Sequence, residues 1–191
     1  MAALFGRLDE VVYRGSELTI ELKSTVVADH GPNTAESIWG ADFGIVASIH
    51  SRVEQIEKAV IGQAKRGSLP NLSRAEAEMF RTQVIKMSHA TDATIGLEVP
   101  AQAGISPLVR LVEVPMMYDG VPIGKNWSLN FDYLLSPENE GDIPIRIGKA
   151  LPLGEYLYAQ VLRCFHGDSN SGLIRSLDDS SLTTLRIEAR R

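Results

Sequence analysis

The segment that decides the fold covers residues 40–67 and has the sequence GADFGIVASIH–SRVEQIEK–AVIGQAKRG. Two apolar runs rich in Val, Ile and Ala are joined by a short polar connection. This pattern predicts two neighbouring antiparallel strands, at about residues 42–49 and 58–64. In an antiparallel pair the start of the first strand lies beside the end of the second, so the sequences GAD and GQAK should meet at one corner of the sheet.

The predicted corner brings together three side chains of different chemistry. Asp42 opens the first strand, and Gln63 and Lys65 close the second. Because side chains two residues apart on a strand point to the same face, Gln63 and Lys65 should emerge side by side while Ala64 turns into the core. The corner would then hold one carboxylate, one neutral oxygen ligand and one ammonium group.

These three groups suit a phosphodiester substrate. Carboxylate and amide oxygens are ligands for Mg²⁺ or Mn²⁺, which prefer oxygen and keep several waters. A lysine beside the metal ion can steer a water or offset the charge that develops on a phosphate. Positive residues outnumber negative ones between residues 58 and 86, as expected beside a nucleic-acid backbone, although such a cluster is also common on a plain solvated face.

The rest of the chain predicts an α/β core with additions. We expect a helix at residues 16–27 with Ser16 as its N-cap, and a second helix after Ser73 with Glu76 at the capping-box position. Residues 94–99 should form a strand, residues 108–114 a strand or a helical turn, residues 153–165 a helix, and the last segment, SLTTLRIEARR, a strand. Residues 1–114 would form the core, and residues 115–191 a C-terminal elaboration of the same domain, irregular up to residue 150.

Composition is that of an ordinary soluble protein. The 191 residues are 44% hydrophobic and 23% charged, with a net charge of −5. No apolar run approaches the roughly 20 residues that span a bilayer, and the N-terminus lacks the cationic start of a secretory signal. We therefore expect a cytoplasmic protein without membrane contact. A single cysteine, Cys164, excludes a disulfide framework or a multi-cysteine zinc site within one chain.

The two motifs of the corner resemble those of a nuclease superfamily. GADF at a strand start, about twenty residues before VIGQAKR, resembles the PD-(D/E)XK superfamily in a variant with Gln in place of the second acid. The resemblance implies a restriction-endonuclease-like αβββαβ core. It also implies that Asp42 is the main metal ligand, that Gln63 takes the position of the second acid and that Lys65 is the catalytic lysine. The segment before Asp42 departs from the family pattern, because it lacks the proline of the family's name.

The family often adds an acid from its first helix. Glu17 matches that position best and would complete the catalytic and metal-binding set, while Glu21 and Glu36 are the alternatives. A further acid matters here because Gln63 carries no charge, so the corner alone holds only one negative group.

The resemblance also implies an activity and partners. It points to an Mg²⁺-dependent (or Mn²⁺-dependent) endonuclease that hydrolyses DNA in restriction or anti-phage defence, with DNA and a subunit of a defence complex as partners. Because cutting both strands requires two active sites, a homo-oligomer is expected. Two alternatives stay open: a catalytically inactive domain of this fold that binds a partner protein or DNA, and an enzyme that cleaves RNA.

Each candidate residue also has an ordinary structural explanation. Asp42 can cap a turn before a strand, Lys65 can be an edge charge, and Glu17 can be a first-turn acid that favours the helix dipole. The four histidines are dispersed and lack zinc-ligand spacing. Trp39 and Trp127 can stack on bases, but packing at the rim of a core is the commoner role.

Overall fold

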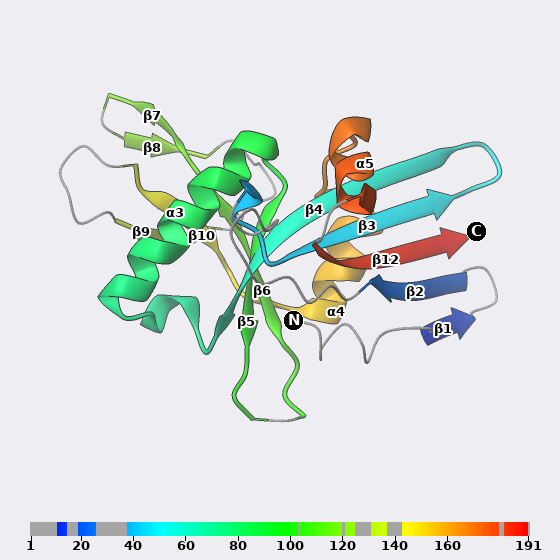
Figure 1. The fold of residues 1–191 in the computed structure, drawn as a ribbon, viewed down its shortest axis with the longest axis horizontal. Helices are drawn as coiled ribbons and strands as arrows, with labels where there is room; N and C mark the ends of the chain where they lie inside the picture. The colour runs from blue at the N-terminus through cyan, green and yellow to red at the C-terminus, as the bar shows by residue number, and fades with distance from the viewer. Residues whose placement is uncertain are drawn as a thin grey trace.

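The protein is organised around one long, twisted β-sheet with helices on both of its faces (Figure 1). The computed structural model describes residues 11–14, 19–25, 38–102, 104–119, 121–124, 131–136, 143–179 and 182–190, and all side chains among them except those of Pro122, Phe131 and Asp179. The strands of the large sheet are β1 (Val11–Arg14), β2 (Thr19–Thr25), β3 (Phe43–His50), β4 (Gln55–Arg66), β5 (Thr94–Val99), β6 (Leu108–Glu113), β9 (Phe131–Leu135), β10 (Ile145–Gly148), β11 (Leu151–Pro152) and β12 (Thr183–Arg190).

The large sheet is mixed and mostly antiparallel. Its described strands follow the order β1-β2-β12-β3-β4-β5-β6-β10-β9, and β11 pairs with β6. Only the pairs β12–β3 and β4–β5 are parallel among the described strands. Two further strands, β7 (Met116–Tyr118) and β8 (Val121–Ile123), form a separate antiparallel ribbon. Segments expected to be irregular between residues 115 and 150 are therefore partly strands.

The hairpin of β3 and β4 is confirmed and is longer than predicted. The strands pair antiparallel from Phe43 opposite Gly62 to His50 opposite Gln55. Residues 43–49 are all buried, because β3 lies between two strands and under helices on both faces. Burial on both faces explains why the sequence of this strand is almost continuously apolar instead of alternating.

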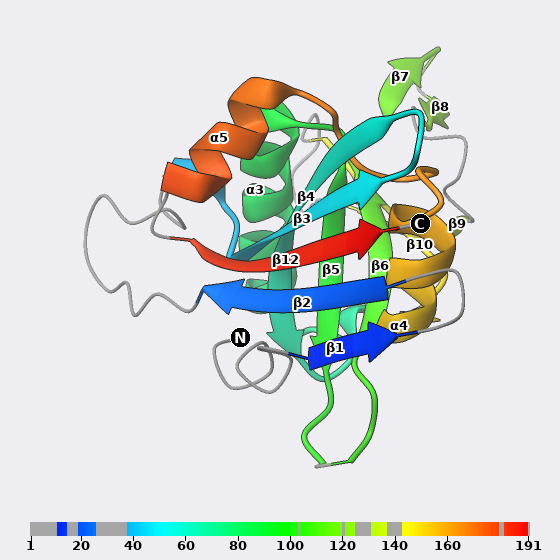
Figure 2. The same cartoon turned by 90° about the vertical axis from the view of Figure 1, so that its right-hand side faces the viewer.

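The C-terminal strand is confirmed, and it lies inside the sheet. Strand β12 pairs with β2 on one side and runs parallel to β3 on the other, with Thr183 beside Phe43 (Figure 2). The sheet around the corner is thus completed by the last residues of the chain, so residues 1–114 do not close this core by themselves.

Helix α3 (Arg74–Ala90) has the predicted start. The Ser73 side chain accepts the Glu76 backbone N–H, and the Glu76 carboxylate accepts the Ser73 backbone N–H at 2.9 Å, which is the reciprocal capping box. The short 3₁₀ turn η1 (Leu69–Asn71) links β4 to this helix. Because α3 connects β4 to its parallel neighbour β5, it covers the sheet face beside the predicted corner.

The core consists of two clusters, one on each face of the sheet. Helix α3 and helix α5 (Ser171–Asp179) cover one face, where Phe80, Val84 and Leu177 are buried with Ile61 of β4. Helix α4 (Leu153–Tyr156) and the π-helical turn η2 (Leu157–Val161) cover the other face. Figure 2 shows α3 and α5 on one side of the strands and α4 on the other.

Two local expectations need correction, and one open alternative is resolved. Residues 19–25, predicted as part of a helix, form strand β2, because the β-branched residues of TIELKST find strand partners in β1 and β12. The helix predicted at residues 153–165 is α4 followed by a π-helical turn, and α5 was not predicted. Residues 108–113, left open between strand and helix, form β6.

The expected α/β class is confirmed at the level of a mixed sheet with helices on both faces. Among the described helices, none combines the length and the apolar character needed to cross a membrane.

A buried hydrogen-bonded pair, Tyr156 and His166, lies on the sheet face that α4 covers. The Tyr156 hydroxyl lies 2.7 Å from His166 Nδ1, and the two side chains are 0% and 4% exposed. Burial, followed by the charge of Lys58, lowers the pKa of His166 to about 4, and burial raises the pKa of Tyr156 well above its usual value. The folded protein therefore holds His166 neutral over a pH range in which the unfolded chain binds a proton.

This pair should make stability depend on pH. Since the pKa of His166 is lower in the folded state than its unfolded value of about 6.5, stability is complete above that value and falls as pH drops toward 4. From pH 7 to pH 5, His166 should remove about 2 kcal/mol from the free energy of unfolding. Urea denaturation of the wild type and of His166→Gln at both pH values measures this as a difference between the two proteins. An equal pH response in both would contradict it.

Candidate functional site

Asp42 is fixed against the end of β4 by two hydrogen bonds. Its backbone N–H donates to the Gly62 carbonyl at 2.8 Å, and its carboxylate Oδ2 accepts the Ala64 backbone N–H at 2.8 Å. The second bond places the carboxylate beside the backbone between Gln63 and Lys65. Because a carboxylate has about four acceptor positions, it can accept the Ala64 N–H and take part in further interactions.

Gln63 is completely buried at the same corner. Its Nε2 donates to the Gly40 carbonyl at 3.1 Å, which fixes the orientation of the amide. Its Oε1 is buried and has no hydrogen-bond partner within the described part of the chain. Nearly all buried polar groups are paired, and an unpaired one costs about 1–3 kcal/mol, so this oxygen calls for a partner that the described residues do not supply.

Lys65 lies on the same face as Gln63, turned toward α3. Its Nζ donates to Gln83 Oε1 at 2.9 Å, while Ala64 packs against the core on the opposite, α4 side of the sheet. The alternation expected from the sequence is therefore present. The structure brings Asp42, Gln63 and Lys65 together in what we call the corner.

Gly40 holds the entry to β3 against α3. Its φ of +70° lies in the left-handed region, and a Cβ at this position would meet the Gln83 carbonyl oxygen at 2.5 Å and the Lys86 Cβ at 2.9 Å. Only glycine combines this backbone conformation with such a close approach. The glycine of GAD thus sets how closely Asp42 and α3 approach the end of β4.

The donor set of the corner fits a divalent cation of the Mg²⁺ type. Asp42 supplies a carboxylate and Gln63 supplies the unpaired Oε1, and Mg²⁺ commonly uses one or two protein oxygens and several waters. Among the described residues no group of three or more His, Cys, Asp or Glu side chains could hold a metal ion. The fit therefore rests on two protein ligands, the Asp42 carboxylate and the unpaired Gln63 Oε1.

Of the three candidates for the additional acid, only Glu21 lies among the described residues. Glu17 and Glu36 lie outside the described residues. In the sheet, Glu21 of β2 lies opposite Glu188 of β12, which in turn lies beside Ser48 of β3. Ser48 is roughly 17 Å along the strand from Phe43. Glu21 also forms an ion pair with Lys23 at 3.3 Å. Glu21 therefore does not reach Asp42, and its proposed role as an alternative acid is wrong.

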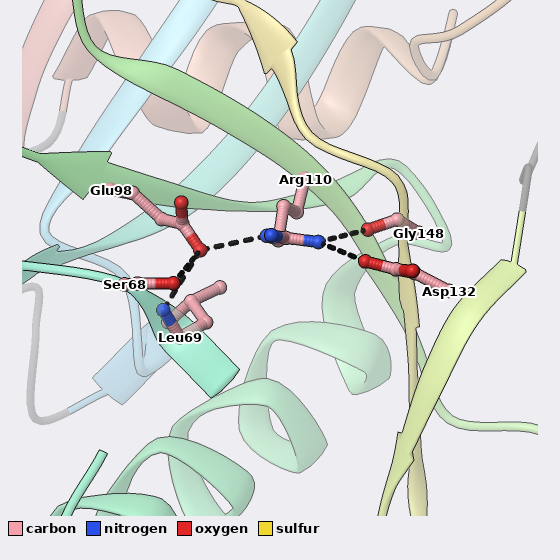
Figure 3. A network of polar contacts seen from close by, with 6 residues as sticks. All are labelled: Ser68, Leu69, Glu98, Arg110, Asp132 and Gly148. Atoms are coloured by element: carbon pink, nitrogen blue, oxygen red, sulfur yellow. Dashed lines mark hydrogen bonds and ion pairs between the residues drawn. The ribbon is translucent and has the colours of Figure 1, made fainter. Parts of the chain in front are cut away.

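A buried ion pair that sequence analysis missed lies on the neighbouring strands. Glu98 of β5 is the register partner of Lys65, and its Oε1 accepts from Arg110 Nε at 2.7 Å and from the Leu69 backbone N–H at 2.8 Å (Figure 3). Arg110 also donates to Asp132 at 2.7 Å and to the Gly148 carbonyl at 3.0 Å. The network therefore ties the turn that follows Lys65 to β5, β6, β9 and the end of β10.

The pKa of Arg110 reflects this environment. Burial by itself would lower the pKa, but the hydrogen bonds to Asp132 and Glu98 outweigh it and leave the pKa raised. Burial also raises the pKa of the neighbouring Tyr133, whose hydroxyl is buried without a hydrogen-bond partner within the described residues. The guanidinium is thus permanently charged and held by two carboxylates. A charged residue inside the apolar run LVRLVEV was the available signal for such a pair.

The contact of Gly40 with α3 can be tested against a second glycine. Gly67 has a φ of +88° but open space where a Cβ would lie. Gly67→Ala should cost about 1–2 kcal/mol from backbone strain alone. Gly40→Ala should cost about 3 kcal/mol or more, because the contact with α3 is lost as well. Urea denaturation measures both, and equal losses would contradict this role of Gly40.

The Glu98–Arg110 pair should show the cost of an unpaired buried charge. Arg110→Met should lower the free energy of unfolding by about 3–5 kcal/mol, and adding Glu98→Gln should recover part of it. Arg190→Met is the matched control, because its ion pair with Glu188 is exposed and should contribute at most about 1 kcal/mol. Additive losses in the double variant would argue against direct coupling between residues 98 and 110.

No family model, curated protein or solved structure matches this chain.

Proposed function

We propose that the protein is a metal-dependent endonuclease that hydrolyses DNA phosphodiester bonds, with a restriction-endonuclease-like core. The observation that carries the proposal is the corner: the Asp42 carboxylate is bonded to the backbone N–H of Ala64, between Gln63, whose buried Oε1 has no partner among the described residues, and Lys65, whose ammonium group is oriented by Gln83. The succession of β3, β4, α3 and β5 supports the same fold, because it matches the strand, strand, helix, strand part of the expected core.

Each residue of the corner has a defined task in this proposal. Asp42 and Gln63 Oε1 would hold Mg²⁺ or Mn²⁺, which supplies Lewis-acid activation of the phosphate and of a bound water. Lys65, oriented by Gln83, places its ammonium group where negative charge builds on a phosphate oxygen as water adds to phosphorus and the bond to the leaving oxygen breaks. Because Gln83 fixes the ammonium before substrate arrives, little reorganisation is needed during the reaction.

The remaining features of the proposal follow from this chemistry. Glu17 is the candidate for a further acid, DNA is the substrate, and a second copy would be needed to cut both strands. The motif resemblance agrees with a cytoplasmic protein that acts in restriction or anti-phage defence together with a partner subunit. The rival function, an inactive domain that binds DNA or a protein, is favoured by the uncharged Gln63 and is decided by the experiments below.

Cleavage is tested with supercoiled plasmid in the presence of Mg²⁺ or Mn²⁺. Asp42→Asn and Lys65→Met should each lower the nicking rate about 100-fold or more, because one ligand or one charge at the reacting phosphate is lost. Glu54→Gln is the matched control, since this exposed acid lies in the turn at the opposite end of the hairpin. Metal-dependent nicking that is equal in all four proteins would assign the activity to a contaminant, and its absence in all would favour the inactive domain.

Metal binding is tested independently of cleavage through Gln63→Glu. Without metal, the new buried carboxylate faces the Gly40 carbonyl and should lower the melting temperature relative to the wild type. Added Mg²⁺ should then raise the melting temperature of Gln63→Glu more than that of the wild type, and should not raise that of Asp42→Asn. A metal response that is the same in Asp42→Asn and in the wild type would place the metal elsewhere.

A further inference from the structure

A cavity lies next to the corner, along the same helix. It is lined by Ile38, Trp39, Lys86, His89 and Ala90 and has a volume of about 290 Å³. This volume is just below the range of ligand pockets, which begins at about 300 Å³, and suits a small, flat group.

The cavity is linked to the corner by two short segments, Trp39–Gly40 and one turn of α3. Trp39 directly precedes Gly40, whose carbonyl is bonded to Gln63 and whose backbone packs on α3 between Gln83 and Lys86. On α3, Lys86 follows Gln83, the partner of Lys65, by one turn, and the helix rises about 1.5 Å per residue. The cavity therefore begins within about one helical turn of the residue that orients the ammonium group.

The cavity has the chemistry of a site for a base and its phosphate. The indole of Trp39 is partly buried against the core, so its position is fixed, and Lys86 and His89 supply cationic and hydrogen-bonding groups. No carboxylate occurs among the described residues that line it. The cavity around Thr91 and His166 differs in this respect, because Asp92 and Asp168 line it and would repel a phosphate.

We propose that this cavity receives an unpaired nucleobase of the substrate strand, stacked on Trp39, with the adjoining phosphate on Lys86. The inference rests on the proposed function and narrows its substrate class to DNA that contains unpaired bases. A base within a duplex exposes only its edges in the grooves, so it can stack face to face on the Trp39 ring only after it leaves the stack. Single-stranded or frayed DNA should therefore bind more tightly than a blunt duplex.

The first experiment observes Trp39 directly. In Trp127→Phe, Trp39 is the only tryptophan left, and the protein is titrated with a short single-stranded oligonucleotide in EDTA, so that no cleavage occurs. Stacking on a base should quench the Trp39 emission, and a blunt duplex of the same sequence should quench it much less. Binding of the single strand without any change in Trp39 emission would overturn the proposal.

The second experiment measures affinity by fluorescence anisotropy of a labelled single strand. Trp39→Leu should weaken binding about 10-fold and Trp39→Phe less, because Phe retains a ring for stacking. Phe165→Leu is the matched control, since it removes an exposed aromatic ring from a different site. Lys86→Gln should weaken binding and reduce its salt dependence, whereas Lys23→Gln, on β2, should not. Affinities within two-fold of the wild type for both Trp39→Leu and Lys86→Gln would overturn the proposal.

These results can be separated from those on cleavage. Asp42→Asn should lose nicking but keep the quenching of Trp39, because the cavity does not include Asp42. Quenching in a protein that never cleaves DNA would uphold the cavity and reject the nuclease. Normal cleavage without quenching would uphold the nuclease and reject the cavity as a nucleobase site.

Discussion

The structure depends on the antiparallel pairing of β3 with β4, and at its end on the bond from the Ala64 backbone N–H to the Asp42 carboxylate. This bond takes the place of a ladder hydrogen bond at the point where the hairpin opens. It locks a carboxylate beside the backbone of the segment that carries Gln63 and Lys65. The energetic consequence is a preformed corner, since the charged group is held by the fold and does not need to be gathered when a ligand binds.

The surroundings of the corner keep these groups in position. On one side Gly40 packs on α3 without a side chain, and Gln83 of the same helix orients Lys65. On the other side the Glu98–Arg110 pair ties the turn after β4 to the neighbouring strands. Burying the charges of Glu98 and Arg110 is costly. The cost is offset because each charged group makes further hydrogen bonds besides the ion pair itself, as buried ion pairs require. At the corner itself, Gln63 Oε1 is buried and has no hydrogen-bond partner among the described residues.

Much of this arrangement could be predicted from sequence, for identifiable physical reasons. The β3–β4 hairpin and the capping box of α3 depend on local patterns, so the neighbourhood of Asp42, Gln63 and Lys65 followed from them. Strand β2 could not be predicted from local patterns, because Leu18, Leu22 and Val26 also fit a helical face. Its strand conformation depends on pairing with the distant β12. The central place of β12 and the Glu98–Arg110 pair are long-range features that local patterns do not encode. The candidate acid Glu17 was tied to a helix, and residues 19–25 of that helix are a strand.

Asp42 and Gln63 are proposed to hold one divalent cation together, and a crystal soaked with Mn²⁺ would show whether they do. We expect an anomalous difference peak within coordination distance of the Asp42 carboxylate and Gln63 Oε1, which disappears in crystals of Asp42→Asn. A Mn²⁺ peak elsewhere, or no peak beside an ordered corner, would contradict it.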